Sequence, residues 1–206
     1  MKYKAPYALF GNGSNPRHPT VKDRLKSINT FFCVDGGADK LITMGYSPDV
    51  ILGDLDSIDK ENKIYNSTIV HLEDQSKNDL EKSISWCVNQ GIEELELFGF
   101  SYGRDDHHLA NLFIMKNFSD RIKMKMYTDK SLIFCINKHS TFLSEANQTV
   151  SIFTFNKKTT ITTTGLKYPL KNAPLSSPSQ GISNLSTGSG FSVDPSDWTF
   201  IIINYM

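Results

Sequence analysis

The sequence has little cysteine and no excess of charge of either sign. Of its 206 residues only three are cysteines, at positions 33, 87 and 135. They are odd in number, far apart and set among apolar residues. This argues against a disulfide framework or a zinc site and favours reduced, buried thiols. Lys and Arg together number 22, as do Asp and Glu. No basic excess therefore indicates a nucleic-acid partner.

Long apolar runs are also missing. No run approaches the length of a membrane span, and residues 1–6 carry no apolar signal core. Hydrophobic residues make up 39% of the chain and charged residues 21%, an ordinary globular balance. We therefore expect a cytoplasmic protein that does not enter a membrane.

The first two-thirds of the chain alternates short apolar runs with helical patterns. This alternation is typical of a mostly parallel, Rossmann-like sheet with helices on both faces. Asn78 is expected to cap the second helix, with Glu81 as the returning carboxylate. We therefore predict an α/β domain over residues 1–130. Its strands are expected at 7–10, 31–34, 50–52, 68–70 and 95–100, and its helices at 38–44, 80–90 and 108–118, the last with Leu109, Leu112 and Phe113 on one face.

The pattern changes near residue 130. Turn residues separate four β-like runs at 132–136, 150–155, 159–164 and 200–203, and no convincing helix remains. This predicts a small β-sandwich domain over residues 131–206. The stretch 171–190 is rich in Ser, Pro, Gly and Asn, so we expect a functional loop or a poorly ordered one there.

The most informative segment is an apolar run over 50–52 that ends in Asp54 and Asp56. In an extended segment this spacing places both carboxylates on one face. Two like charges side by side need a compensating cation. A hard divalent ion such as Mg²⁺, which usually arrives with phosphates, suits oxygen ligands of this kind. The alternative is a solvated turn with a capping aspartate.

Two further polar clusters occupy corresponding places. Residues 74–79 open a helix, and residues 103–107 follow the strand expected at 95–100. In open α/β sheets, ligands bind outside the carboxyl ends of the strands. The three clusters together therefore predict a ligand site at one edge of the sheet.

In this order, the clusters resemble the thiamine pyrophosphokinase family. The Gly-Asp-Leu-Asp-Ser segment and the Thr-Thr-Gly-Leu-Lys-Tyr segment are specific in combination. One departure is Tyr102, which precedes Gly103 where the family usually has a second glycine. The matching segments are 35–38, 48–58, 74–75, 78–79, 103–107, 163–170 and 183–184.

The resemblance implies an α/β catalytic domain followed by a β-sandwich that binds thiamine and forms a dimer. It implies transfer of pyrophosphate from ATP to the thiamine hydroxyl, with Mg²⁺ as cofactor and release of AMP. It further implies a homodimer whose active sites are built from both subunits. Two alternatives stay open: a related pyrophosphokinase for another alcohol such as a pterin, and a nucleotide-binding module without turnover.

The resemblance also implies roles for individual residues. Asp106 is expected to orient Arg104 or to assist at the thiamine hydroxyl. A salt bridge of Arg104 to Asp105 or Asp106 is the alternative for that arginine, and His107 and His108 are expected to be structural. The implied metal ligands are Asp54, Asp56 and Asp79; the nucleotide side comprises Asp35, Gly36, Gly37 and Arg104; the thiamine side comprises Gln75, Ser183 and Asn184. Thiamine is cationic, so an aromatic face suits it, and we expect Tyr168 to offer one; Trp198 is the alternative, although core packing is the better explanation for that residue.

Overall fold

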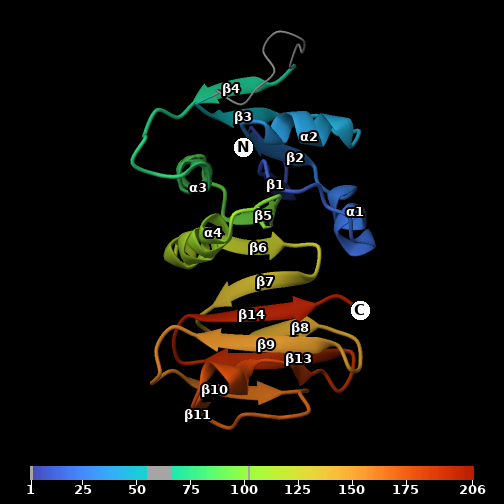
Figure 1. The fold of residues 1–206 in the computed structure, drawn as a ribbon, viewed down its shortest axis with the longest axis vertical. Helices are drawn as coiled ribbons and strands as arrows, with labels where there is room; N and C mark the ends of the chain where they lie inside the picture. The colour runs from blue at the N-terminus through green and yellow to red at the C-terminus, as the bar shows by residue number, and fades with distance from the viewer. Residues whose placement is uncertain (1, 55–65, 102) are drawn as a thin grey trace. The chain divides into compact units, whose positions relative to one another are not determined.

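The structure is a computed structural model that describes residues 2–54, 66–101 and 103–206. Asp56, one of the expected metal ligands, and Tyr102 lie outside the described residues. The chain separates into two compact units, Met1–Asp129 and Lys130–Met206. Figure 1 shows the strands and helices of both. No helix in the described ranges is long and apolar enough to cross a membrane.

The strands of the first unit belong to the larger of the two sheets and follow the order β6-β5-β1-β2-β3-β4 in it. Every strand pair in this unit is parallel. The carboxyl ends of its strands therefore share one edge. The strands are β1 (Tyr7–Phe10), β2 (Thr30–Val34), β3 (Val50–Gly53), β4 (Thr68–His71), β5 (Glu94–Phe98) and β6 (Lys123–Tyr127).

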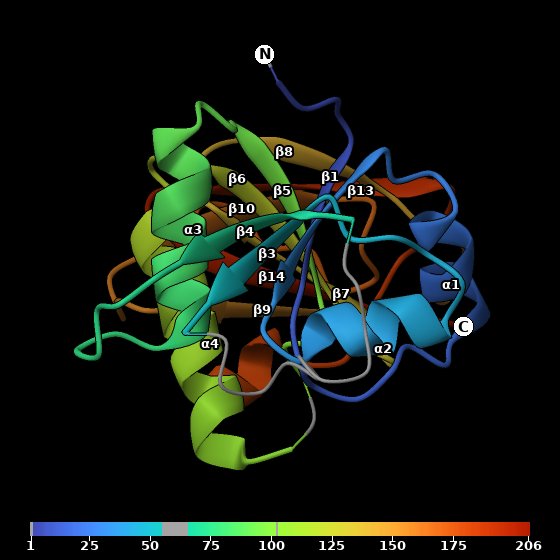
Figure 2. The ribbon, with the colours of Figure 1, turned by 90° about the horizontal axis from the view of Figure 1, so that it is seen from above.

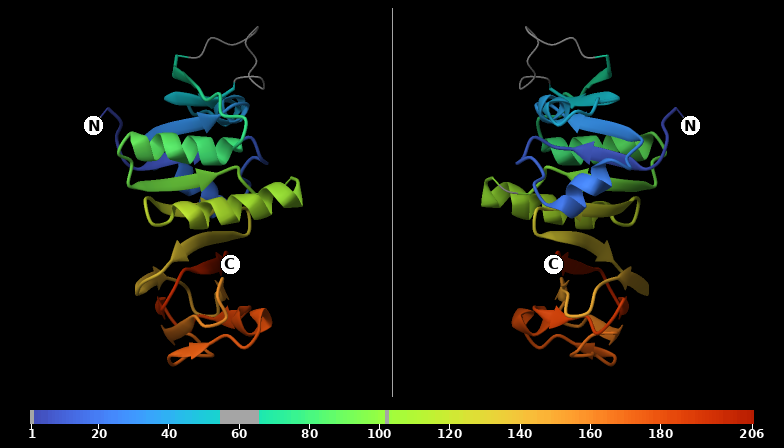
Figure 3. Two further views of the ribbon diagram at one scale, coloured as in Figure 1. Left: turned by 90° about the vertical axis from the view of Figure 1, so that its left-hand side faces the viewer. Right: turned by 90° about the vertical axis from the view of Figure 1, so that its right-hand side faces the viewer.

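Helices cover both faces of this sheet. Helices α1 (Pro19–Leu25) and α2 (Gly37–Thr43) lie on one face, and α3 (Asp79–Asn89) and α4 (Asp105–Phe118) on the other (Figures 2 and 3). Strands β1, β2 and β3 are buried along their whole length. Burial on both faces explains why these strands are continuous apolar runs and do not alternate with polar residues.

Two element boundaries differ by two residues or more from the sequence-based expectation. Strand β5 ends at Phe98, because Gly99 turns the chain with a positive φ of 72°. Helix α4 begins at Asp105, three residues early, because Arg104 caps it in an extended conformation. Acidic side chains in a first turn interact favourably with the helix dipole, and Asp105 and Asp106 stand there. Helix α1 and strand β6 were not expected.

The expected apolar face of α4 is not its buried face. Leu109 and Phe113 are 57% and 50% exposed, whereas Asn111, Met115 and Phe118 are buried. The helix carries apolar side chains on more than one side, so periodicity alone does not decide which side packs on the sheet.

The second unit contains two antiparallel sheets. One has the order β12-β9-β14-β7 and the other β11-β10-β13-β8. Both sheets contribute to one core that includes Phe142, Val150, Ile161, Phe191 and Ile201. The strands are β7 (Ser131–Ile136), β8 (Ser140–Leu143), β9 (Thr149–Thr154), β10 (Thr160–Thr164), β11 (Ala173–Pro174), β12 (Asn184–Leu185), β13 (Gly190–Pro195) and β14 (Thr199–Asn204).

The stretch 171–190 has more structure than its composition indicates. It contains β11, the 3₁₀ helix η1 (Pro178–Gly181) and β12, so one short 3₁₀ turn is described in a unit for which the sequence showed no convincing helix. Pro178 stands in the first turn of η1, where its fixed φ is suited to a helix start. Strands β8 and β13 were also not expected.

Candidate active site

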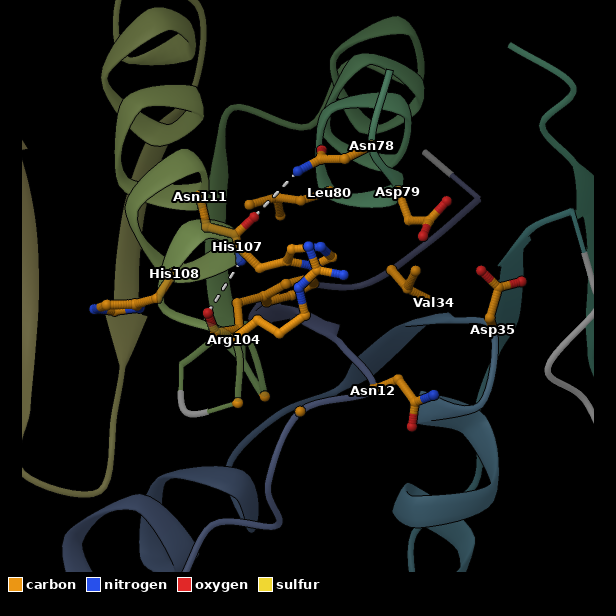
Figure 4. Close-up of a pocket in the computed structure, with 14 residues that line it drawn as sticks. Asn12, Val34, Asp35, Asn78, Asp79, Leu80, Arg104, His107, His108 and Asn111 are labelled. Atoms are coloured by element: carbon orange, nitrogen blue, oxygen red, sulfur yellow. Dashed lines mark hydrogen bonds between the residues drawn. The ribbon is translucent and has the colours of Figure 1, made fainter. Parts of the chain in front are cut away.

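A cavity of about 300 Å³ lies in the first unit, at the carboxyl ends of its strands. Figure 4 shows Asp35, Asp79 and Arg104 around it. Five segments meet there because parallel strands all deliver their following loops to the same edge. The lining residues are Asn12 and Gly13 after β1; Val34 and Asp35 at the end of β2; Asn78, Asp79 and Leu80 at the start of α3; Gly99, Phe100, Gly103 and Arg104 after β5; and His107, His108 and Asn111 on α4.

Asp35 is held in an unusual backbone conformation beside β3. Its φ is +42°, a left-handed value, and the residue is only 6% exposed. Its carboxylate lies against the backbone of Gly53, where a Cβ atom would overlap Asp35 Oδ1. Gly53 therefore makes room for the carboxylate, and the next residue along the chain is Asp54.

Asp79 stands at the first position of α3. Asn78 caps this helix as expected, because its side-chain oxygen accepts from the backbone N–H of Glu81 at 2.9 Å. One turn on, Lys82 Nζ lies 2.8 Å from Asp79 Oδ1, and the lysine side chain is only 5% exposed. Burial lowers the pKa of Lys82. The hydrogen bond and charge of Asp79, with the charges of Asp54 and Asp35, raise this pKa by more than burial lowers it, so the net result is an increase.

The cavity and its surroundings supply ligands suited to a hard cation. Asp35, Asp54 and Asp79 offer carboxylate oxygens, the donors that Mg²⁺ and similar ions take. Of these three carboxylates, that of Asp79 is paired with the ammonium of Lys82. Within the described ranges, however, no three His, Cys, Asp or Glu side chains are arranged to hold a metal ion. The donor type fits a divalent ion, and Asp56 lies outside the described residues.

Arg104 forms a two-pronged ion pair with Asp106. Its Nε donates to Asp106 Oδ1 at 3.1 Å and its Nη2 to Oδ2 at 2.6 Å. The hydrogen bond from Arg104 lowers the pKa of Asp106 to about 2. Both side chains are exposed, so water and salt screen the pair and its net stabilisation is small. Of the two partners considered from the sequence, the arginine pairs with Asp106.

A chain of amides joins the helices on the cavity's side of the sheet. Asn78 Nδ2 donates to Asn111 Oδ1 at 3.3 Å, and Asn111 Nδ2 donates to the carbonyl of Phe100 at 3.1 Å. These bonds tie the start of α3 to α4 and to the loop after β5. His107 and His108 also line the cavity, and Figure 4 shows the ring of His108 directed away from Asp35 and Asp79.

The loop after β1 is fixed by Lys40 of α2. Lys40 Nζ donates to the carbonyls of Asn12 and Gly13, each at 2.6 Å. Gly13 N also donates to the carbonyl of Gly99 at 2.8 Å, which brings this loop against the loop after β5. The backbone of the loop is therefore held in place beside the cavity from two sides.

Gly36 and Gly37 are buried and do not line the cavity. A Cβ atom on Gly37 would come within 2.6 Å of the carbonyl oxygen of Phe10. Close packing of α2 on β1 therefore accounts for Gly37. Gln75 is exposed and is likewise not a lining residue.

Three residues expected on the thiamine side lie together in the second unit. Asn184 Oδ1 accepts from the backbone N–H of Tyr168 at 3.0 Å, and its Nδ2 donates to the Tyr168 carbonyl at 2.7 Å. The Asn184 amide thus holds the backbone of Tyr168, whose side chain is 62% exposed. Ser183 has a positive φ of 59°, and its N–H donates to Ser151 Oγ at 3.2 Å.

Three polar side chains at or beside the cavity were not expected from the sequence: those of Lys40, Lys82 and Asn111. For Lys82 a signal existed, because a lysine three residues after Asp79 can pair with it on a helix. Lys40 and Asn111 contact segments 28 and 11 residues away, and no local pattern reports such contacts.

Two family models match the chain, one in each of its units, and a solved structure shares its fold. A family model described as the thiamin pyrophosphokinase catalytic domain matches residues 21–128, and one described as its vitamin B1 binding domain matches residues 136–194. In the solved structure of thiamine pyrophosphokinase from Bacillus subtilis the same fold recurs, with a TM-score of 0.83, 23% identity and coverage of 97% of this chain and 98% of that one.

Two curated relatives share more of the sequence. Thiamin pyrophosphokinase 1 of Caenorhabditis elegans is 30% identical over an aligned length of 140 residues, and the match covers 62% of this chain and 58% of the relative. Thiamine pyrophosphokinase 1 of Oryza sativa subsp. japonica is 30% identical over 176 residues, 70% of this chain and 66% of the relative. The matched region therefore spans less than two-thirds of these two relatives. With both family models matched in order along the sequence, the chain belongs to the thiamin pyrophosphokinase family.

Proposed function

We propose that this protein transfers pyrophosphate from ATP to the hydroxyl of thiamine, giving thiamine diphosphate and AMP. One observation carries the proposal: in a chain of this family, Asp35, Asp79 and Arg104 line a single cavity at the carboxyl ends of the parallel strands. Carboxylates for a metal-bound phosphate chain and an arginine for phosphate oxygens are the groups this chemistry requires.

In the proposed reaction, the thiamine oxygen bonds to the β-phosphorus of ATP and the bond from that phosphorus to the α-phosphate oxygen breaks. The hydroxyl proton leaves as the new ester forms, and AMP carries away the bonding electrons. Little covalent chemistry falls to the protein, so its contribution is positioning and neutralisation of charge.

Asp54, Asp56 and Asp79 are the residues we assign to a divalent ion, Mg²⁺ in our proposal, with Asp35 close by on the nucleotide side. The charge of the ion would offset negative charge on the phosphates. The chain's own part is to hold its carboxylates ionised and oriented, and the seating of Asp35 against Gly53 supports that role.

Arg104 is assigned to the phosphate oxygens of ATP. Asp106 accepts from Nε and Nη2 of Arg104 and holds the guanidinium plane. The edge formed by Nη1 and Nη2 carries two further N–H groups in the geometry that binds phosphate with two hydrogen bonds. A carboxylate with a pKa of about 2 is a weak base. We therefore assign Asp106 to orienting Arg104 and give it no part in accepting the thiamine proton. Gly36 and Gly37 are assigned to the turn that carries Asp35, beside the nucleotide.

For thiamine we propose Gln75, Tyr168, Ser183 and Asn184. The exposed ring of Tyr168 offers an aromatic face to the cationic thiazolium. The two hydrogen bonds between the Asn184 side chain and the Tyr168 backbone support a fixed position for this ring. We also propose a homodimer in which each active site takes residues from both chains, so that Ser183 and Asn184 of one chain serve its partner.

Two further statements, on the class of fold and on the cellular location, complete the proposal. The parallel pairing of all strands in the first unit supports a Rossmann-like classification of that unit. The absence of disulfides among the three cysteines, all of which are described, supports a reducing compartment. We accordingly propose a cytoplasmic location.

The test is turnover by the purified protein with ATP, Mg²⁺ and thiamine, followed by separation of the products. We expect thiamine diphosphate and AMP, and no product from the Asp54→Asn variant. A parallel reaction with a hydroxymethyl pterin as acceptor tests the choice of alcohol. Product from the pterin and none from thiamine would contradict the proposed substrate, and binding of ATP without any product would contradict catalysis.

A further inference from the structure

The loop between β1 and α1, residues 11–18, reaches the candidate active site with its first half only. Asn12 and Gly13 line the cavity, and the residues after them continue to α1. Within this loop, all of which is described, only Gly11 and Pro16 are buried. A segment with little buried surface of its own opens easily. Its position at the cavity therefore depends on the hydrogen bonds that hold it.

Asp129 holds the second half of this loop. Its Oδ1 accepts from the backbone N–H of Arg17 at 2.7 Å and from that of His18 at 3.3 Å. The carboxylate follows β6 and lies 112 residues from Arg17 along the chain. Hydrogen bonds that a carboxylate accepts are about twice as strong as those between neutral groups. Asp129 is thus a strong acceptor for this loop, and the proposed reaction gives it no role.

The packing beside this half of the loop is incomplete. A cavity of about 10 Å³ remains there, and Ser14, Pro16, Ser101 and Asp129 are among the residues that line it. This volume suits about one water molecule. Close packing therefore does not fix this part of the loop, which leaves that task to the hydrogen bonds with Asp129.

The far end of the loop is fixed as well, because α1 is tied to the sheet. Arg24 of α1 donates through Nε and Nη2 to the two carboxylate oxygens of Glu96 on β5, each at 2.6 Å. Nearer the cavity, Gly13 is bound through its backbone N–H. With the Asp129 anchor in place, residues 14–16 form the span between two held positions. A span this short has few conformations open to it, so the anchor also restricts Gly13.

We propose that Asp129 is a positioning residue for the nucleotide. By binding the backbone of Arg17 and His18 it holds Asn12 and Gly13 at the cavity, where they meet ATP. Asp129 itself does not line that cavity, so it acts through the loop and does not contact substrate. The assignment rests on the proposed function, in which ATP occupies the cavity. Because the loop meets ATP both before and during the transfer, loss of Asp129 raises the KM for ATP and leaves kcat nearly unchanged.

Hydrogen exchange of single backbone amides tests the anchor without any substrate. In Asp129→Ala the amides of Arg17, His18 and Gly13 should exchange roughly tenfold faster than in the wild type. Asp129→Asn keeps an Oδ1 acceptor and should fall between the two. The matched control is Asp23→Ala, which removes an exposed carboxylate on α1 and should leave all three amides unchanged. Unchanged exchange at Gly13 in Asp129→Ala overturns the inference, because the anchor would then end short of the cavity.

Steady-state kinetics test the consequence for the nucleotide. Asp129→Ala should raise the KM for ATP roughly tenfold, with kcat and the KM for thiamine within about twofold of the wild type. A merely structural role would lower the active fraction, and with it kcat, at an unchanged KM for ATP, and that result overturns the inference. If Asp129→Ala does not fold, Asp129→Asn decides: a KM for ATP raised roughly threefold supports the inference, and a wild-type KM overturns it.

Calorimetric titration with ATP and Mg²⁺, without thiamine, separates this inference from the proposed function. Wild-type turnover of ATP and thiamine, together with equal ATP affinity in the wild type and Asp129→Ala, overturns the inference alone. Roughly tenfold weaker ATP binding in Asp129→Ala, with no turnover by the wild type, overturns the proposed function alone.

Discussion

At the scale of single residues, Gly53 is explained by the side chain beside it. The carboxylate of Asp35 occupies the space that a Cβ atom on Gly53 would need, and Gly53 itself has a φ of +150°. The glycine in the Gly-Asp pair is therefore a requirement of the cluster and not only a feature of a turn. This contact joins the ends of two neighbouring strands, β2 and β3.

Gly53→Ala is expected to destabilise the protein by at least about 1–3 kcal/mol, the cost of one strained backbone position, with an added cost from the overlap with Asp35. Urea unfolding measures the loss. Gly45→Ala is the matched control, because Gly45 also has a positive φ, of 87°, but no atom within 4 Å of the added Cβ. An equal loss in both variants would show that the contact with Asp35 costs nothing.

The ion pair of Arg104 and Asp106 gives a prediction about pH. Arg104 lowers the pKa of Asp106 from its ordinary 3.8 to about 2. For a depressed carboxyl pKa, the stabilisation is present above the unfolded-state value and is lost as the pH falls through the folded-state value. The pair should therefore persist at pH 4 and above and break between about pH 4 and pH 2.

Carboxyl ¹³C chemical shifts recorded across this pH range measure the titration of Asp106 directly. In Arg104→Gln the midpoint should return toward 3.8, because the largest cause of the shift, the hydrogen bond from Arg104, is gone. A wild-type midpoint near 3.8 would mean that the pair does not persist in solution.

At the scale of elements, the loop after β1 owes its position to a helix. Lys40 of α2 donates to two carbonyls of this loop, and a hydrogen bond from a charged group contributes about 1.5–3 kcal/mol. Lys40→Met is therefore expected to loosen Asn12 and Gly13 and to raise the KM for ATP roughly tenfold or more, with a smaller change in kcat.

Steady-state kinetics with varied ATP check this expectation. Lys22→Met, a change of an exposed lysine on α1, should leave both constants near their wild-type values. Unchanged KM in Lys40→Met would separate this loop from nucleotide binding. An equal fall of kcat and kcat/KM would place the loop's effect in the transition state.

Local patterns predicted the elements that local forces decide. The cap of α3 by Asn78 and the apolar strands β1, β2 and β3 follow from short-range rules, and the structure confirms them. The buried face of α4 depends on tertiary packing, so periodicity selected Leu109 and Phe113 wrongly. Strand β6 alternates exposed lysines with buried methionines, a period-two signal that was present but short.

At the scale of the whole molecule, the residues assigned to ATP lie in the first compact unit, whereas those assigned to thiamine are divided between it (Gln75) and the second unit (Tyr168, Ser183 and Asn184). Spacing in the sequence predicted the carboxylates because each follows a strand or begins a helix. The pairing of Lys82 with Asp79 has a local signal, because the two residues are three apart on a helix, but the burial of Lys82 depends on tertiary packing. The hydrogen bonds between the Asn184 side chain and the Tyr168 backbone join residues 16 positions apart, and no local sequence pattern predicts them either.

The proposed sharing of sites in a homodimer predicts complementation between two inactive parents. Asp54→Asn removes a metal ligand in the first unit, and Asn184→Ala releases Tyr168 in the second. After subunit exchange, one site of each mixed dimer combines two intact halves, and up to about half of the wild-type activity per mixed dimer should return. Verified mixed dimers that stay inactive, from folded parents, would place each site within one chain.

The most direct test of the central claim follows the phosphorus atoms of ATP. The protein is incubated with thiamine, Mg²⁺ and ATP labelled with ³²P at either the α or the γ position, and the products are separated. The account predicts that the α label appears only in AMP and the γ label only in thiamine diphosphate. Release of ADP with the γ label in thiamine monophosphate, or the absence of any labelled thiamine ester, would contradict it.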